Sequence, residues 1–336
     1  MSDLTVTTVI PTFNRAHLLG RALSSVVRNS RPGDEIIVVD NGSTDHTDVV
    51  IAQFGDAVRS YVIRPRGAGF ARNLGVREAH GDLVAFLDSD DEWFDGKLDK
   101  QRSFMQQRTD VLFCFTNFAG RDKEGNIHHN ALQGWHNDQR SWKEILGGER
   151  LYSLICPIAS ESDDFYCYHG DLYLSELRAN YVFTSTMVVR REDAADSLHF
   201  AEDTPTYEDW ECFGRLSRKG NAAYLDVETA WQHAHTGPRL TDADAVRAAQ
   251  ARLTIIERVW GNDPRFMAKH SEEYDKLLNE QKMIVAGGLI VDGRTREARS
   301  MLDGIADLPL SYRIGSRIPG PVAKALHRIK RLVSGS

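Results

Sequence analysis

Three carboxylates occur within four residues, at Asp88, Asp90 and Asp91, directly after the apolar run 83–87. Packed carboxylates repel one another and resist burial unless a cation or hydrogen-bond donors compensate their charge. Such a cluster is typical of a cation site. A solvated acidic turn in which Asp88 or Asp91 caps the next helix would have the same composition. The surrounding sequence has to decide between the two interpretations.

The first 115 residues alternate between strand-like and helix-like patterns. Apolar runs at 6–10, 36–39, 58–63 and 83–87 predict strands. Apolar residues at helical spacing predict helices after residue 15, after a cap at 43–45, and over about 70–79. This alternation predicts an α/β fold with a mostly parallel sheet flanked by helices. In such sheets ligands bind beyond the carboxyl ends of the strands.

Polar residues follow these predicted strand ends, so we expect them to meet at one rim of the sheet. They are Pro11, Thr12, Asn14 and Arg15 after the first strand, Asp40 after the second, and the acidic cluster after the fourth. The loop 67–72 begins like a dinucleotide-binding motif, but it follows the third strand and has Arg72 where a small residue belongs. Arg66 and Arg72 flank a helix start and could bind phosphate; surface arginines around a turn are the alternative.

Four segments together closely resemble family 2 glycosyltransferases, and their order and spacing match too. They are Val9-Ile10-Pro11-Thr12-Phe13-Asn14-Arg15, Ile37-Val38-Val39-Asp40-Asn41-Gly42-Ser43-Thr44-Asp45, Ala71-Arg72-Asn73 with Gly75, and Phe86-Leu87-Asp88-Ser89-Asp90-Asp91. The resemblance covers about residues 5–235 and is strongest before residue 100. It implies the GT-A fold, a single nucleotide-sugar-binding α/β domain whose reaction inverts configuration at the anomeric carbon.

The resemblance also implies roles for the residues of the donor side. The backbone around Pro11 and Thr12 would border the nucleobase, and Asp40 would accept a hydrogen bond from the ring NH of a uracil-like base. Asn14 and Arg15 belong to the same nucleotide-binding segment.

A divalent cation, Mn²⁺ or Mg²⁺, is the cofactor that the resemblance implies, because both ions prefer oxygen ligands. Asp88 would bind ribose hydroxyls or lie beside the metal, and Asp90 would be the direct ligand. Asp91 is an extra carboxylate and competes for that assignment. The sequence predicts a strand at 223–227 and a loop over 231–237. His235 in this loop would lie near the diphosphate or the metal, with His233 as its competitor; the usual tyrosine-arginine start of this segment is missing.

The acidic segment 206–211 opens a predicted helix and resembles the family's catalytic acidic pair. Asp209 would then be the general base that removes the acceptor proton, with Glu208 as its neighbour. The alternative is that these carboxylates only complement the helix dipole in its first turn. The segment 181–190 reads as a loop entering a strand and is similar to the family segment on the acceptor side.

We expect the main domain to span residues 1–240. The sequence predicts one distinct region within it and two after it. The stretch 120–180 is an irregular, aromatic insertion that would either stack on an acceptor sugar or form a small satellite core. Residues 241–310 predict a helical appendage. Residues 311–336 predict a basic amphipathic tail, with six cations and no carboxylate after Asp307. We expect this tail, over 315–336, to lie on an anionic membrane surface; a final helix packed on its own domain is the alternative.

Composition narrows the class of protein. The net charge of −7 over 336 residues argues against nucleic-acid binding. The four cysteines form no CxxC pair, which argues against a zinc or redox site. No apolar run is long enough to span a bilayer and no secretory signal is recognisable, so we expect a cytoplasmic location, peripheral to the inner face of the membrane.

The sequence therefore predicts an inverting glycosyltransferase. It would move a sugar from a nucleotide-diphosphate donor, a UDP-sugar, to a glycan or lipid-linked acceptor in polysaccharide assembly. A nucleotidyltransferase is a second hypothesis, although the glycine-rich, lysine-bearing phosphate loop expected after the first strand is absent. A catalytically silent carbohydrate-binding protein is a third, against which the intact Asp90 and Asp209 argue.

Overall fold

The computed structural model describes residues 3–136, 138–158, 163–204, 206–234 and 244–325. Contacts divide the chain into two compact units. The first comprises residues 1–203 and 208–237, and the second comprises 204–207 and 238–336. Each unit is described by itself below.

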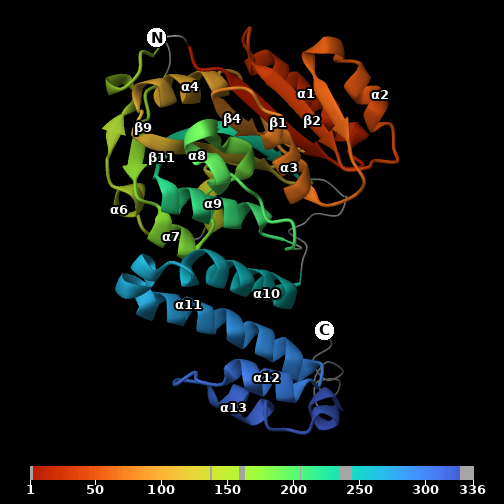
Figure 1. Ribbon diagram of the computed structural model, residues 1–336, viewed down its shortest axis with the longest axis vertical. Coiled ribbons are helices and arrows are strands. Elements are labelled where there is room, and N and C mark those ends of the chain that lie inside the picture. Colours follow the sequence, from red (N-terminus) through yellow and green to blue (C-terminus); the bar gives the residue numbers. More distant parts are fainter. Residues whose placement is uncertain (1–2, 137, 159–162, 205, 235–243, 326–336) are drawn as a thin grey trace. The chain divides into compact units, whose positions relative to one another are not determined.

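The first unit is built on an 11-stranded sheet with the order β3-β2-β1-β4-β10-β6-β11-β9-β8 within the described residues, with β5 and β7 paired at its side (Figure 1). The strands are β1 (Val6–Thr12), β2 (Glu35–Asp40), β3 (Arg59–Val62), β4 (Leu83–Phe86), β5 (Glu92–Trp93), β6 (Val111–Arg121), β7 (Ile127–His128), β8 (Arg150–Leu151), β9 (Tyr166–Gly170), β10 (Val188–Arg190) and β11 (Asn221–His233). The first four strands are parallel, as the alternating pattern predicted. The sheet becomes mixed at β10, which is antiparallel to both β4 and β6.

Helices cover both faces of this sheet. They are α1 (Ala16–Asn29), α2 (Thr47–Ala52), α3 (Ala68–Arg77), α4 (Lys97–Gln107), α5 (Ala131–His136), α6 (Trp142–Leu146), α7 (Tyr173–Arg178), α8 (Arg191–Ala194) and α9 (Glu208–Lys219), with 3-10 turns η1 (Gly55–Ala57), η2 (Tyr152–Leu154), η3 (Thr184–Thr186) and η4 (Ala195–Ser197). The predicted strands and helices of the first 115 residues are all present, with ends that differ by a few residues.

Alternate residues of β2 face opposite layers. Ile36 and Val38 belong to the main core, which also holds the apolar face of α1, whereas Ile37 and Val39 pack with Ala71 of α3. Gly75 lets α3 approach β1 closely, because a Cβ atom there would lie 2.3 Å from Cγ1 of Val9. The family-like segment around Gly75 therefore has a packing reason for its glycine.

The insertion at 120–180 is more regular than its sequence predicted. Its strand β9 pairs antiparallel with β11 and so extends the central sheet. Most of its aromatic side chains pack against the main core. Trp142, for example, stacks on Tyr224 of β11 with 3.9 Å between ring centroids. Most of these aromatic residues therefore pack against the main core and do not form the separate satellite core that was one of the two alternatives; Tyr166 is exposed.

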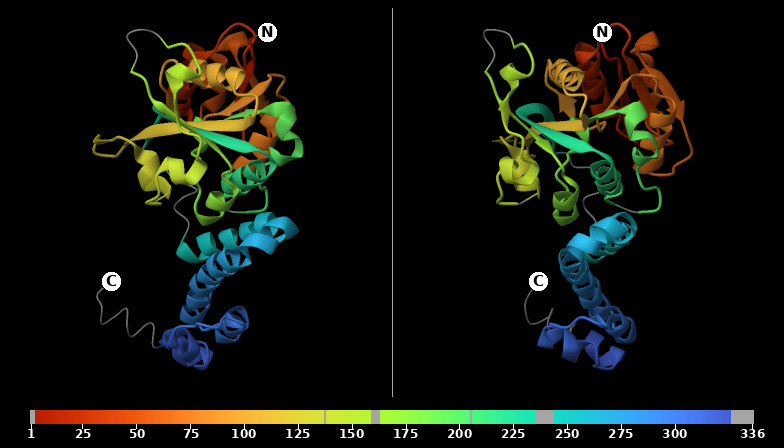
Figure 2. Two further views of the ribbon diagram at one scale, coloured as in Figure 1. Left: turned by 90° about the vertical axis from the view of Figure 1, so that its left-hand side faces the viewer. Right: turned by 60° about the vertical axis from the view of Figure 1, so that its left-hand side comes forward.

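One boundary prediction was wrong. The sequence indicated a strand at 223–227 followed by a loop over 231–237, but β11 continues to His233 beside the long strand β6 (Figure 2). The pairing of β11 with β6 contains register shifts between Leu225 and Glu228 and between Glu228 and Trp231. Such bulges break the two-residue alternation by which a strand is recognised in a sequence.

The second unit is helical, as predicted. It contains α10 (Ala245–Ile256), a π-helical turn (Glu257–Gly261), α11 (Pro264–Val291), α12 (Thr295–Leu302) and α13 (Leu310–Gly315). Asp244 and Asp263 cap α10 and α11, each accepting two backbone N–H bonds. The predicted tail is described only to residue 325. Among the described residues, no helix is both long and apolar enough to cross a membrane.

Candidate active site

The loops after β1 and β2 are joined by hydrogen bonds at the rim of the sheet. Thr12 pairs with Asp40 at the carboxyl ends of the two strands. The Asn14 backbone N–H donates to Oγ of Ser43 (2.8 Å), and the Asn14 side-chain oxygen accepts from the Thr44 N–H (2.8 Å). Asn14 adopts φ 51°, a left-handed conformation that asparagine tolerates well. The two predicted nucleotide-binding loops are therefore one connected element.

Asp40 is buried at this junction. Its Oδ1 accepts from both the N–H (2.9 Å) and the hydroxyl (2.6 Å) of Ser43, which fixes the carboxylate beside Thr12. Arg15, also in the first loop, lies with its Nε 3.9 Å from Oδ2 of Asp90. The structure thus brings the predicted base-binding residues and the acidic cluster to the same edge of the sheet.

Arg72 lies between two carboxylates that come from distant parts of the chain. Its Nη2 donates to Asp88 at 2.6 Å and its Nη1 donates to Glu208 at 2.8 Å. The residue is only 4% exposed, and the two carboxylates raise the pKa of its guanidinium against the effect of burial. Arg72 is therefore not a surface arginine. Whether it also contacts a phosphate stays a prediction.

Arg66 has different surroundings. Its side chain is 56% exposed, lies 3.7 Å from the Phe70 ring centroid and pairs with Glu202 at 3.5 Å. The alternative that we raised, an arginine on the surface of a turn, describes Arg66 but not Arg72.

The three acidic residues after β4 have different environments. Asp91 is buried, and its Oδ2 accepts a 2.5 Å hydrogen bond from the Ser185 hydroxyl. The Asp90 side chain is 26% exposed and faces Arg15. Burial raises the pKa of Asp88, Arg72 opposes this, and the Asp90 carboxylate raises it further. Asp88 and Asp90 therefore repel each other at the rim, whereas Asp91 points inward.

These carboxylates suit a hard divalent cation, because they supply oxygen donors and their repulsion would be relieved by positive charge. In the part of the chain that the structure describes, however, no group of three His, Cys, Asp or Glu side chains is arranged to hold a metal ion. His233 is buried and its Nε2 lies 3.4 Å from Glu92. His235 lies outside the described residues. The choice between these two histidines therefore stays open.

The predicted base, Asp209, lies in the first turn of α9, near the acidic residues that follow β4. Its Oδ2 accepts from the Thr184 hydroxyl at 3.1 Å and its Oδ1 from the Trp210 N–H at 2.8 Å. Burial raises the pKa of Asp209 to about 6; the Glu208 carboxylate raises it too, while Arg72 and Thr184 lower it. A carboxylate with this pKa is mostly ionised at pH 7 yet accepts a proton more readily than an ordinary aspartate. Asp209 and Glu208 thus have specific partners beyond the helix dipole.

Several residues that hold the site were named from the sequence only as members of longer segments, without a role of their own. Thr184 and Ser185 form hydrogen bonds to Asp209 and Asp91. Asn73 bonds through its side chain to both the N–H and the carbonyl of Phe200 (2.8 and 2.9 Å). A polar run of Thr184, Ser185 and Thr186 just before an apolar strand was the available signal, because buried hydroxyls need partners.

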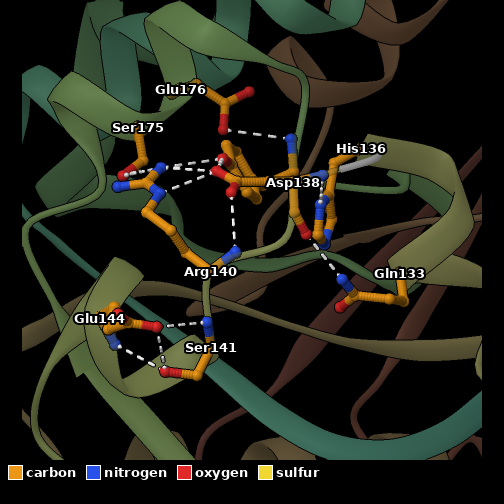
Figure 3. A network of polar contacts seen from close by, with 9 residues as sticks. Gln133, His136, Asp138, Arg140, Ser141, Glu144, Ser175 and Glu176 are labelled. Atoms are coloured by element: carbon orange, nitrogen blue, oxygen red, sulfur yellow. Dashed lines mark hydrogen bonds and ion pairs between the residues drawn. The ribbon is translucent and has the colours of Figure 1, made fainter.

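A second polar network lies in the insertion (Figure 3). Arg140 donates to Asp138 (2.7 Å), Ser175 (3.2 Å) and the Tyr181 hydroxyl (3.0 Å), and that hydroxyl donates to Asp138. Glu176 is fully buried and its Oε2 accepts from the Tyr181 N–H at 3.4 Å.

Glu176 also connects this network to the base. Burial raises the pKa of Glu176 well above its ordinary value, the Tyr181 N–H lowers it, and Asp209 raises it. Its backbone carbonyl accepts from the Trp210 indole at 2.7 Å. The network therefore supports the residue next to Asp209.

Comparison with known proteins identifies the class of the first unit. Residues 7–162 match the family model described as glycosyl transferase family 2. The structure is similar to that of TarS residues 1–349 from S. aureus in complex with UDP-GlcNAc, with a TM-score of 0.56, 16% identity, and coverage of 93% of this chain and 92% of that one. It also resembles the mannosyltransferase PcManGT from Pyrobaculum calidifontis in complex with GDP-Man and Mn²⁺, with a TM-score of 0.53, 16% identity, and coverage of 98% and 88%.

Residues 7–162 therefore form a glycosyltransferase family 2 domain, and the fold is similar to that of solved GT-A glycosyltransferases. A curated relative is the UDP-Glc:alpha-D-GlcNAc-diphosphoundecaprenol beta-1,3-glucosyltransferase WfgD of Escherichia coli, 32% identical over 136 residues, which are 40% of this chain and 51% of WfgD. The chain spans about half the length, or less, of the first curated relatives that it matches.

Proposed function

We propose that this protein is an inverting glycosyltransferase that moves a sugar from a UDP-sugar to a glycan or lipid-linked acceptor in cell-envelope polysaccharide assembly. One observation carries the proposal: Arg72 joins Asp88, at the end of β4, to Glu208, which is next to Asp209. A donor-binding carboxylate and a base with a raised pKa thus lie in one network. The names of WfgD, with UDP-Glc and a diphosphoundecaprenol acceptor, and of TarS, with UDP-GlcNAc, support the choice of donor and acceptor.

In the proposed reaction, Asp209 takes the proton of an acceptor hydroxyl. The acceptor oxygen forms a bond to the anomeric carbon from the face opposite the diphosphate, and the bond from that carbon to the diphosphate oxygen breaks with its electron pair on the diphosphate. Asp40, Pro11 and Thr12 bind the nucleobase. Asn14 joins the two loops that carry these residues, so its contribution is to keep the base-binding site in shape.

Asp90, with Asp88 beside it, would hold Mn²⁺ or Mg²⁺, and such an ion supplies positive charge to the leaving diphosphate. We prefer Asp90 to Asp91 because the Asp91 carboxylate is buried on Ser185. The Mn²⁺ in the name of the PcManGT structure supports a divalent cation. We assign Arg15 and Arg66 to binding of the donor's diphosphate. Arg72 would join them by exchanging its ion pair with Asp88 for a contact with the diphosphate.

We further propose that residues 1–240 form the catalytic domain, 241–310 a helical appendage, and 311–336 a tail that contacts an anionic membrane surface on the cytoplasmic side. Leu310 and Ile314 on α13 are 69% and 54% exposed, one helical turn apart. Arg313 and Arg317 lie beside them in the sequence. Exposed apolar residues flanked by cations are suited to the headgroup region of an anionic bilayer.

A panel of nucleotide-sugars tests the proposal. We expect a UDP-sugar with Mn²⁺ to raise the melting temperature of the purified chain and, with an acceptor, to release UDP. Release of pyrophosphate instead would support the nucleotidyltransferase. Thermal stabilisation by sugars alone, with neither hydrolysis nor transfer across the panel, would support a carbohydrate-binding protein.

A further inference from the structure

We propose that the turn η3, through Thr184 and Ser185, fixes the position of two groups relative to each other. One is the acidic corner, which consists of Asp88, Asp90 and Asp91 after β4, and the other is the proposed base Asp209. This inference rests on the proposed function. The two residues are neighbours in the chain, yet one holds the base and the other holds the acidic corner. Neither would touch substrate, so both are positioning residues.

Ser185 holds the acidic corner. It is fully buried, and its hydroxyl donates to Oδ2 of Asp91 (2.5 Å) while accepting from the backbone N–H of Asp88 (3.1 Å). Its carbonyl accepts from the indole of Trp93 at 2.6 Å. One residue therefore fixes the backbone at the first aspartate and the side chain of the last, and Asp90 lies between them.

Thr184 holds the base. Its buried hydroxyl donates to Oδ2 of Asp209 at 3.1 Å. The turn itself is held by two internal bonds to Phe183 from Thr186, one from its N–H and one from its hydroxyl (both 2.8 Å). The Phe183 ring packs 4.3 Å from that of Phe118 on β6, which anchors the turn on the sheet.

The sheet topology explains why this turn reaches both groups. Strand β10 begins at Val188, with one residue between it and the end of the turn, and runs antiparallel to β4. The start of β10 therefore lies beside the end of β4, where the acidic corner begins. Consecutive Cα atoms are about 3.8 Å apart, so a movement of one residue of the turn is transmitted to the other. Arg72 adds a second connection between the same two groups.

The pH dependence of turnover tests Thr184. Among the described residues, the charged or titratable groups that interact with Asp209 include Glu208, Arg72, Glu176 and Cys212. The Thr184 hydroxyl favours the ionised form of Asp209, so Thr184→Val should raise the pKa of the base and move the acid limb of kcat upward by roughly half to one pH unit. Thr184→Ser keeps the hydroxyl and should restore the limb.

Thr186→Val is the matched control. It removes a hydroxyl from the same turn that bonds only to the Phe183 carbonyl among the described residues, so it should leave the limb in place. The role of Thr184 would be refuted if the acid limb of kcat stayed in place in Thr184→Val. It would also be refuted if the limb moved equally in Thr186→Val. Thr184→Ala, with the same prediction, replaces Thr184→Val if the valine variant does not fold.

Calorimetry with UDP and Mn²⁺ tests Ser185 without requiring turnover. Ser185→Ala should weaken UDP binding by about tenfold, because two groups of the acidic corner lose their partner. Ser217→Ala removes a buried hydroxyl of α9 that has no partner among the described residues and should bind UDP like the wild type. Equal affinity of Ser185→Ala and wild type would refute the role of Ser185. Failure of the wild type itself to bind UDP would instead refute the proposed function.

Discussion

The proposed donor side and the proposed acceptor side of this site are built in different ways. On the donor side, the residues come from loops that directly follow β1, β2 and β4. The first two loops are joined over short stretches of chain, because Asp40 bonds Ser43 three residues on and Asn14 bonds Ser43 29 residues on. The third loop is held by Ser185, which bonds Asp91 94 residues away. On the acceptor side, Asp209 and its support depend on contacts such as Arg72 with Glu208, 136 residues apart. The two proposed nucleobase-binding loops are thus encoded locally, whereas the candidate base and the acidic residues after β4 are positioned by tertiary contacts.

The largest effect should come from removing the base while leaving the donor side intact. Asp209→Asn keeps the shape of the side chain but cannot take a proton, so transfer should fall by about 10² to 10⁴ while UDP binding is retained. Kinetics and calorimetry on one preparation measure both. Asp193→Asn, which removes an exposed carboxylate from the first turn of α8, is the control for a helix-dipole effect. Undiminished turnover in Asp209→Asn would rule out the base.

The next effect concerns the residue that joins the two sides. Arg72→Leu would leave Asp88 and Glu208 without their shared cation, and breaking a buried ion pair costs about 3 to 5 kcal/mol of unfolding free energy. Both UDP binding and transfer should weaken. Urea unfolding measures the loss of stability, and Arg66→Leu, at an exposed arginine, is the control for this stability measurement alone. Equal stability of the two variants would mean that Arg72 does not couple the two sides.

A smaller effect should separate the two adjacent aspartates of the donor side. Asp90→Asn should lose the part of UDP binding that depends on Mn²⁺. Asp91→Asn should retain it but lose about 2 kcal/mol of stability, because the buried bond from Ser185 would no longer go to a charged acceptor. Calorimetry with and without Mn²⁺, together with urea unfolding, gives both quantities. The reverse pattern would make Asp91 the metal ligand.

The smallest effect lies outside the site, in the tail. Lys330→Glu with Arg331→Glu should weaken binding to anionic vesicles, measured by flotation, by about thirtyfold, since each cation near such a surface contributes about 1 kcal/mol. Transfer to a soluble acceptor should not change. Lys269→Glu with Lys276→Glu makes the same charge change on exposed residues of α11 and should not affect flotation. Equal flotation of both double variants and the wild type would exclude the membrane contact.

The comparison of the two sides also explains which parts of the fold and the site could be predicted from the sequence. The strands, the helices and the rim of polar residues were predictable, because hydrophobic period and turn residues are local signals. The family-like segments around Asp40 and Asp88 follow the same rule. The end of β11 was predicted wrongly because bulges interrupt its alternation.

The sequence by itself determined the class of fold, the acidic corner and the candidate base, since each depends on residues that are close together in the chain. Only the tertiary structure decided that Asp91 points inward to Ser185, that Arg72 is buried between Asp88 and Glu208, and that Thr184 bonds Asp209. The physical reason is that a hydrogen bond between buried side chains depends on which segments the fold places side by side, and no local pattern encodes a partner that is 94 or 136 residues away.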